Sequence, residues 1–462
     1  MIFYGTLQKL GQSVCESATA RKNARNAFYG AAEYVALPLA MLAATPFLLY
    51  RLGLAAFGVW MLASAAVTTS NLISNGFGDA ALKYASLYRG QQNEVKFENA
   101  LRASLTINLA LGAAFAALLW GASPFAVNRI FRVDPALHAA AITAFRIGSG
   151  ILMLRCVESV LISALRSHER YGPAVQINIA SRVGMVVTAC VLVWRGQGIA
   201  AIMAATLAIV AGSVLVQAAV VRTLIGRIRL LPSFERAAFA EVFQFGCFSW
   251  LQAVAGCIFS QADKLLIGAL LGTPAVGVYS VCVQAAQPIH GLLAAGLHCF
   301  FPHLGARLAT TPTAQLRSLV HIVLVLNAMS AAALCIPVVV FSRLILRLWM
   351  GAGFAGQTWA VLSIVALGFG FLSLNVTGHY ALLALGQVRL VAAVNLIGGG
   401  AMIAAIFLLT PRFGLAGAAA GRLLYGPVTL LMYGRLHRLL SPGASDPSTP
   451  FPAAVITATQ SQ

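Results

Sequence analysis

The chain has 462 residues, of which 60% are hydrophobic and only 9% are charged, whereas about 25% of the residues of an ordinary soluble chain are charged. Apolar runs of bilayer-spanning length recur from end to end, which predicts an all-α polytopic membrane protein and excludes a soluble enzyme, a coiled coil, a disordered chain and a β-barrel. The net charge of +19 does not indicate a nucleic-acid partner, because the basic residues lie at the ends of the apolar runs and not on one soluble patch.

Hydropathy windows of about 19 residues predict twelve membrane-spanning helices. In chain order the spans lie near 27–51, 57–78, 101–122, 139–164, 173–194, 198–221, 242–271, 274–302, 317–341, 356–384, 387–410 and 413–437. The stretches near 79–100 and 222–241 look amphipathic, so we expect them to lie at the membrane interface. No loop is long enough to hold a folded domain outside the membrane.

The two ends of the chain differ from the spans. Residues 1–26 are predicted to form a short amphipathic cytoplasmic leader, and the Pro/Ser/Thr-rich residues 438–462 a disordered cytoplasmic tail. Nineteen of the 31 Lys and Arg residues fall on one side of the membrane and seven on the other. The excess predicts that both termini lie in the cytoplasm.

A weak internal repeat divides the spans into two sets of six. Residues 52–60 match residues 271–279 at an offset of 219, and the same offset aligns Gly198 with Gly417. Two six-helix lobes in the same orientation, 27–221 and 242–437 joined by the linker 222–241, predict a pseudo-two-fold axis along the membrane normal. Such lobes enclose a central cavity and can rock to alternate its access.

Ionisable side chains inside the spans are candidates for function, because each costs at least about 2.5–3.5 kcal/mol at the bilayer centre. These candidates are Glu33, Arg146, Arg155, Glu158, Arg182, Asp263, Lys264 and Arg422.

Arg155 and Arg182 are the most informative pair. They lie at equal distances from the centre of the predicted hairpin between the fourth and fifth spans, so both reach a depth of about 20 Å from its turn. Glu158 shares a helix face with Arg155 and can neutralise one of the two cations. A guanidinium pair suits a diphosphate, which its planar fork binds in bidentate fashion. The alternative is a structural Arg155–Glu158 ion pair that only fixes helix packing.

The other intramembrane charges support less specific predictions. Arg146 lies near the extracytoplasmic end of its span and could simply extend to the interface. Asp263 and Lys264 are adjacent and point about 100° apart on a helix, so at least one of them needs a partner elsewhere, as does Arg422. The repeat offset carries Arg155 and Arg182 onto Leu374 and Ala401, so we expect the cavity charge to lie mostly in the N-terminal half.

No motif indicates an enzyme, a metal site or a cofactor. The sequence has no Walker A loop, no H-E-x-x-H and no G-x-S-x-G. Its histidines lack metal-ligand spacing, and we expect them to pack or to form hydrogen bonds. Aromatic residues such as Trp60 fit interfacial anchoring, and a few could stack on sugar rings.

Five stretches resemble the polysaccharide and O-antigen flippases of the multidrug/oligosaccharidyl-lipid/polysaccharide exporter superfamily. They are LGLAAFGVWMLASA with NGFGDAALKYAS, the stretch FGCFSWLQAVAGCIFSQADKLLIGALLGTPAVGVYSVCVQAAQPI, ILRLWMGAGF and PRFGLAGAAAGRLL. The resemblance implies twelve spans in two six-helix lobes and transport of an undecaprenyl-diphosphate-linked oligosaccharide across the bacterial inner membrane. Its lipid tail would stay in the bilayer while the sugar head crosses a cationic cavity.

By position and charge, the resemblance makes Arg155, Arg182, Lys264 and Arg422 the cavity cations, with Arg146 as a further candidate. If transport is coupled to protons or sodium, the carriers would be the carboxylates Glu33, Asp79, Glu158 and Asp263. Membrane lipids are expected partners, and a polysaccharide polymerase and chain-length machinery are possible ones.

Two rival functions stay open at this point. A cation-coupled drug exporter of the same superfamily would hold mostly carboxylates in its cavity to suit organic cations. A membrane polysaccharide polymerase or O-antigen ligase would carry a large periplasmic loop, whereas the longest predicted here is short, near 123–138.

Overall fold

A computed structural model describes residues 37–68, 70–168, 171–225, 231–297, 304 and 311–441, and these residues form helices and short turns without a strand. The predicted all-α fold is therefore confirmed. Eight described helices are long and apolar enough to cross a membrane: Leu37–Thr68, Glu94–Ile130, Pro135–Ser167, Gly172–Trp194, Ile199–Leu224, Ala314–Val340, Ala352–Ala384 and Val388–Leu439.

Glycines with a positive φ break the first and the last of these helices. Gly53 (φ 79°) and Gly414 (φ 57°) adopt a backbone conformation that side chains with a Cβ rarely tolerate. Beyond Gly414 the chain folds back, so that Gly417 lies against the backbone of Leu409 and Gly421 against that of Ile406. With these breaks, and with α2, α7 and α8 added, the described residues supply a helix for each of the twelve predicted spans.

The labelled elements follow in chain order. They are α2 (Ser70–Gly90), α3 (Glu94–Phe125), η1 (Ala126–Ile130), η2 (Pro135–Leu137), α4 (His138–Ser167), α5 (Tyr171–Trp194), α6 (Ile199–Leu224), α7 (Arg236–Leu270), α8 (Thr273–Leu297), α10 (Thr313–Val340), α11 (Ser342–Met350), α12 (Ala352–Ala384), α13 (Val388–Leu423), α14 (Tyr425–Thr429) and α15 (Met432–Leu439).

The prediction of an interfacial segment at 79–100 is wrong. Helix α2 continues to Gly90 and α3 begins at Glu94, with a tight turn between them. Gln92 takes a positive φ of 55° in this turn, and the Asn93 side chain caps α3 by accepting a hydrogen bond from the Lys96 amide at 3.0 Å. The charged residues that made this stretch look amphipathic lie on the ends of two long helices. A separate amphipathic helix does exist elsewhere, as α11, where the sequence predicts only a loop.

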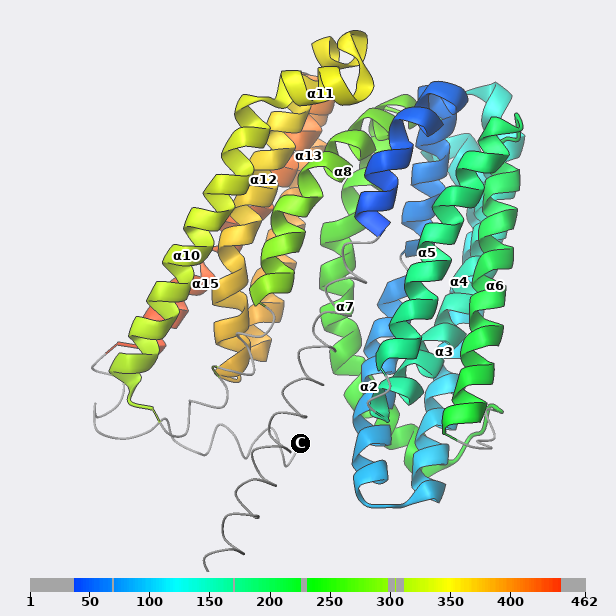
Figure 1. Cartoon of the computed structure of the whole chain (residues 1–462), viewed down its shortest axis with the longest axis vertical. Coiled ribbons are helices and arrows are strands. Elements are labelled where there is room, and N and C mark those ends of the chain that lie inside the picture. Colours follow the sequence, from blue (N-terminus) through cyan, green and yellow to red (C-terminus); the bar gives the residue numbers. More distant parts are fainter. Residues whose placement is uncertain are drawn as a thin grey trace, which may run out of the picture.

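The helices form two groups that meet at one end and diverge toward the other (Figure 1). One group holds the helix Leu37–Thr68 and α2 to α6, and the other holds α8 and α10 to α15.

Helix α7 packs against α2 and α3 and also against α13. The hydroxyl of Tyr88 on α2 donates a hydrogen bond of 2.5 Å to the Glu241 carboxylate on α7. Because α7 contacts both groups, the lobe boundaries 27–221 and 242–437 stay a prediction.

Two glycines related by the repeat pack against each other where the groups meet. A Cβ added to Gly58 would collide with the carbonyl oxygen of Thr273, and a Cβ added to Gly277 would lie 2.7 Å from that of Leu54. Gly58 and Gly277 are 219 residues apart, as are Leu54 and Thr273. Each helix therefore makes the same contact with the other, as a two-fold axis between them requires.

Hydrogen bonds also join the two groups at this end. The Arg132 amide donates to the Gly268 carbonyl at 3.1 Å, and the Thr273 amide donates to the Arg132 carbonyl at 3.2 Å. Within the seam, the hydroxyl of Thr45 lies 2.5 Å from the Gln284 side-chain oxygen. This end of the molecule is thus closed by backbone and side-chain contacts.

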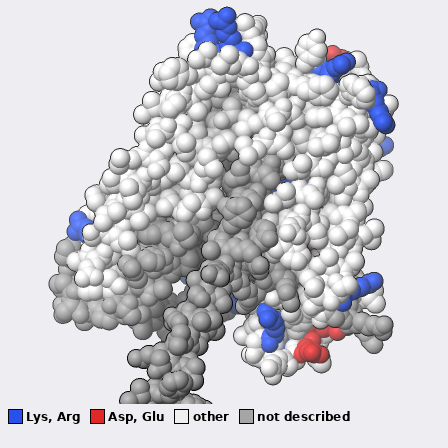
Figure 2. Space-filling view, in the orientation of Figure 1, with Lys and Arg blue, Asp and Glu red and all other residues white. Residues whose placement is uncertain are grey.

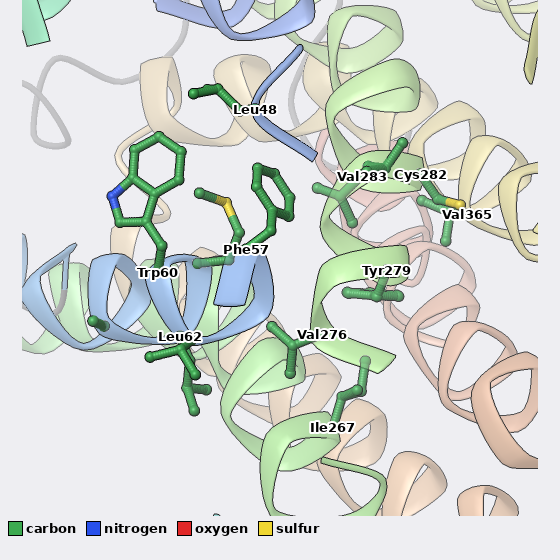
Figure 3. Packing of buried hydrophobic residues seen from close by; sticks show 14 of the residues in the cluster. Leu48, Phe57, Trp60, Leu62, Ile267, Val276, Tyr279, Cys282, Val283 and Val365 are labelled. Carbon is green, nitrogen blue, oxygen red and sulfur yellow. The ribbon is translucent and has the colours of Figure 1, made fainter. Parts of the chain in front are cut away.

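An apolar core fills the seam. Figure 3 shows Phe57 of the first helix between Trp60 on one side and Val283 of α8 on the other. The rings of Phe57 and Trp60 meet edge to face, with centroids 5.9 Å apart. Large apolar side chains such as Leu215 and Leu408 are instead exposed on the outside of the helices, which suits a surface in contact with lipid.

Candidate functional site

A cavity of about 530 Å³ lies among helices of the N-terminal half. Its lining comes from the helix Leu37–Thr68 and from α2, α4, α5 and α6, and all of it falls between Leu37 and Thr206. Five ionisable residues contribute to this lining: Asp79, Arg155, Glu158, Arg166 and Arg182. Three cations and two carboxylates leave about one net positive charge.

Arg155 and Glu158 form an ion pair one turn apart on α4. The Glu158 side chain is 3% exposed, whereas that of Arg155 is 23% exposed. The other carboxylate oxygen of Glu158 accepts hydrogen bonds of 3.0 Å from the Ser213 hydroxyl and from the Gln217 amide, both on α6. Gln217 also donates to Asn178 of α5 at 3.2 Å. The carboxylate is therefore held by several helices, while part of the guanidinium faces the cavity.

Arg182 of α5 lines the same cavity as Arg155. A second nitrogen of Arg155 lies 4.0 Å from the sulfur of Met185, one turn along α5 from Arg182. The hairpin geometry predicted from the sequence thus brings the two arginines to one cavity. The Arg155–Glu158 ion pair of the alternative interpretation also exists, so a ligand-binding role of Arg155 stays a prediction.

Arg166 is a cavity residue that lies beyond the end of the predicted span 139–164. It lies eleven residues, or about three helical turns, after Arg155 on α4, so the two share a face. Ser159 and Ile162, which lie between them on that face, also line the cavity. The charge of Arg166 acts on the carboxylate of Asp79 on α2, which also lines the cavity. The spacing of eleven residues could have revealed this residue.

The sequence analysis did not identify Ser213 and Gln217 as part of this site. They are polar residues four apart in α6, a helix that is otherwise strongly apolar. Polar side chains at this spacing in a spanning helix indicate a buried partner, which here is Glu158.

Asp263, predicted to need a partner elsewhere, finds it in Arg422 of α13. The Tyr279 hydroxyl of α8 donates to the same carboxylate at 2.7 Å, and the Arg422 guanidinium lies 4.8 Å from the ring centroid of Phe369 on α12. Both charged side chains are buried, at 5% and 0% exposure. This cluster joins α7, α8, α12 and α13 and does not line the 530 Å³ cavity.

Two further predicted site residues, Arg146 and Lys264, do not line this cavity. Arg146 stacks on Trp120 of α3, with its guanidinium 5.3 Å from the ring centroid. Lys264, beside Asp263, is not part of the lining either. Glu33 lies outside the described residues. Among the described residues, no group of three or more His, Cys, Asp or Glu side chains could hold a metal ion.

Comparison with known proteins points to one class of membrane protein. A family model described as polysaccharide biosynthesis protein matches residues 48–364. A Shigella flexneri protein whose name describes an O-antigen transporter is 22% identical over 378 residues, 81% of this chain and 87% of that protein. The fold is similar to an inward-facing multidrug resistance MATE family transporter of the MOP superfamily (TM-score 0.73, 14% identity, 90% of this chain and 100% of that one). It is also similar to the lipid II flippase MurJ (TM-score 0.67, 13% identity, 87% of each chain).

Proposed function

Since this chain belongs to the polysaccharide biosynthesis protein family, whose relatives include membrane transporters and flippases of the MOP superfamily, we propose that it flips an undecaprenyl-diphosphate-linked oligosaccharide repeat unit across the bacterial inner membrane. The product would serve synthesis of an exopolysaccharide, a capsule or an O-antigen. A polysaccharide polymerase and chain-length machinery are proposed as later partners on that route.

The charge of the cavity carries this proposal. Three arginines line it, and its two carboxylates are each beside one of them. Arg155 and Arg182 are placed to bind the two phosphates of the carrier lipid, because a guanidinium binds phosphate oxygens in bidentate fashion. Trp60 also lines the cavity and offers an aromatic face to a sugar ring. A volume of about 530 Å³ lies within the usual range for a ligand site, roughly 300–1,000 Å³.

Alternating access follows from the arrangement of the two groups of helices. Reciprocal contacts such as that of Gly58 with Gly277 close one end of the molecule, and the groups diverge at the other end (Figure 1). Rocking of the two groups about this seam is the proposed alternating-access movement. Both termini are proposed to lie in the cytoplasm.

The energy source would act through one of four carboxylates. Glu158 is held by Arg155 and α6, and Asp263 is held by Arg422 and Tyr279. Asp79 is exposed and lines the cavity, so it is the best placed of the described carboxylates to bind a proton or sodium ion. Glu33 remains a further candidate on sequence grounds.

The test is a bacterial strain in which this chain is the only source of the flippase. The variant Arg155→Ala/Arg182→Ala should abolish surface polysaccharide and accumulate the lipid-linked repeat unit, while the protein remains in the membrane. The matched control is Arg195→Ala/Arg412→Ala, which removes two exposed arginines away from the cavity and should leave the polymer unchanged. Normal polymer from the cavity variant would refute the assignment.

A multidrug exporter is the second candidate, favoured by the fold that this chain shares with MATE transporters. Organic cations need accessible carboxylates. Of the two carboxylates in the described lining, Glu158 is paired with Arg155 and 3% exposed, which leaves Asp79 in a cavity with three arginines. Overexpression in a drug-sensitive strain separates the two functions. We expect no rise in the inhibitory concentration of cationic drugs, and a rise abolished by Asp79→Asn would favour the exporter.

A further inference from the structure

The short helix α11 is fixed to the protein along one side. Ser342 and Leu346 are buried, and the hydroxyl of Ser363 on α12 donates a hydrogen bond of 2.9 Å to the Ser342 hydroxyl. The Trp349 indole donates to the backbone carbonyl of Leu42, on the first helix of the other group, at 2.9 Å. The position of α11 is thus set by contacts with both groups of helices.

The outer side of α11 has an apolar edge beside a cationic edge. Leu344 and Leu348 are 51% and 80% exposed and lie four residues apart. Arg343 and Arg347 are also exposed and four residues apart, so they form the adjacent edge. Helix α11 contains no Asp or Glu, and neither arginine takes part in an ion pair with any residue that the structure describes.

The neighbouring helices place α11 at the level where the bilayer ends. Helix α10 stops at Val340, and α12 begins at Ala352. The spanning part of α10, Ala314–Val340, has 27 residues and is about 40 Å long, enough to cross a hydrocarbon core of about 30 Å. Figure 2 shows a blue cluster over the end of the molecule where Figure 1 places α11, above a broad white surface.

We propose that α11 is an interfacial helix that binds the phosphate groups of bilayer phospholipids through Arg343 and Arg347, with Leu344 and Leu348 inserted among the acyl chains. Exposed leucines next to exposed arginines at the bilayer surface suit a lipid, whose phosphate and chains are joined in one molecule. The hydrogen bond from Trp349 to the Leu42 carbonyl links this lipid-bound helix to the helix Leu37–Thr68, at the end where the two groups meet. The proposal holds whichever molecule the cavity carries.

Lipid retention tests the cationic edge. The full chain is reconstituted into nanodiscs of phosphatidylglycerol or phosphatidylcholine, extracted in detergent, and examined by native mass spectrometry for bound phospholipid. The variant Arg343→Ala/Arg347→Ala should lose affinity for phosphatidylglycerol about fivefold per arginine. The control Arg195→Ala/Arg412→Ala removes the same charge from two exposed positions that are far apart in the chain and outside α11, and should retain the lipid. An equal loss in both variants would overturn the proposal, as would displacement of the lipid by inorganic phosphate or selective retention of an isoprenoid phosphate.

Photo-crosslinking tests the apolar edge in an otherwise native chain. Leu348→benzoylphenylalanine should form adducts with acyl chains on illumination in phosphatidylglycerol vesicles. The same substitution at Ala136, which is exposed in the η2 turn, should form several-fold fewer. Absence of acyl adducts at position 348 contradicts the insertion of this edge, independently of how the arginine variants fold.

Discussion

In the N-terminal half, Arg155 pairs with Glu158 beside a cavity, and 23% of the arginine side chain stays accessible. In the C-terminal half, Arg422 pairs with Asp263, and neither side chain is more than 5% exposed. A charge that is kept accessible inside a membrane protein can meet a ligand, whereas a sealed pair can only hold helices together. The comparison supports the proposed ligand contact of the first pair and predicts a packing role for the second.

The two pairs do not occupy equivalent places in the repeat. At the offset of 219, Arg422 corresponds to Met203 and Asp263 to Ala44. The backbone, by contrast, repeats closely, because Gly53 and Gly272 both take positive φ values of 79° and 91°. Duplication thus preserved the turns and close contacts of the frame while the charges diverged.

The largest effect on stability is expected from Asp263→Ala. It would leave the Arg422 guanidinium buried without its carboxylate, at a cost of about 3–5 kcal/mol in the free energy of unfolding. Thermal unfolding in detergent and the amount of protein in the membrane measure this cost. The double variant Asp263→Leu/Arg422→Leu removes both charges and should recover most of the loss. If Asp263→Ala is as stable as the parent, the sealed pair does not stabilise the packing.

A smaller effect on stability is expected from Gly58 and Gly277, which occupy equivalent positions in the two halves and pack at the seam between them. Gly58→Ala and Gly277→Ala each force a Cβ against a carbonyl of the opposite helix, which costs about 1–3 kcal/mol. Because the two residues face each other, the double variant should cost less than the sum of the single ones. Gly121→Ala, where a Cβ meets open space, is the control. Gly58→Ala should be the costlier of the two, because its Cβ comes closer to the opposing carbonyl oxygen than that of Gly277→Ala does. Unchanged stability in either single variant would contradict the contact.

The sequence could predict the helices and the repeat because both depend on local features. Apolar runs locate α3 to α6, and the pattern of Gly272 and Pro274 marks the break between α7 and α8. It could also bring Arg155 and Arg182 together, since a short hairpin fixes relative depth. Helix α11 was missed because its nine residues are shorter than a hydropathy window.

Contacts between helices far apart in sequence could not be predicted in the same way. The partner of Asp263 lies 159 residues away, in Arg422, and hydropathy carries no information on which faces of two spans meet. These features follow from packing, which a single sequence does not reveal.

A modest effect is expected from Gln217→Leu, which tests how firmly Glu158 is held. The variant removes the hydrogen bond from the Gln217 amide to the Glu158 carboxylate, worth about 1.5–3 kcal/mol for a charged acceptor, and partly compensates with apolar contact. A net loss of about 1 kcal/mol in unfolding free energy is therefore expected. Ser213→Ala, which also removes one donor to that carboxylate, should behave alike. A loss as large as that of Asp263→Ala would mean that the two pairs stabilise the fold equally.

The smallest effect on stability is expected from Arg182→Ala, although its effect on transport should be large. Arg182 is half-buried at the cavity, so its removal should change the unfolding free energy by about 0.5 kcal/mol or less, while the output of surface polymer falls more than tenfold. Arg182→Lys keeps the charge but loses the bidentate geometry, and should restore only part of the output. Loss of the Arg182 side chain would then reduce transport without reducing stability, whereas loss of the Asp263 side chain would reduce both. If Arg182→Ala instead unfolds the protein, the accessible arginines stabilise the fold in the same way as the sealed pair.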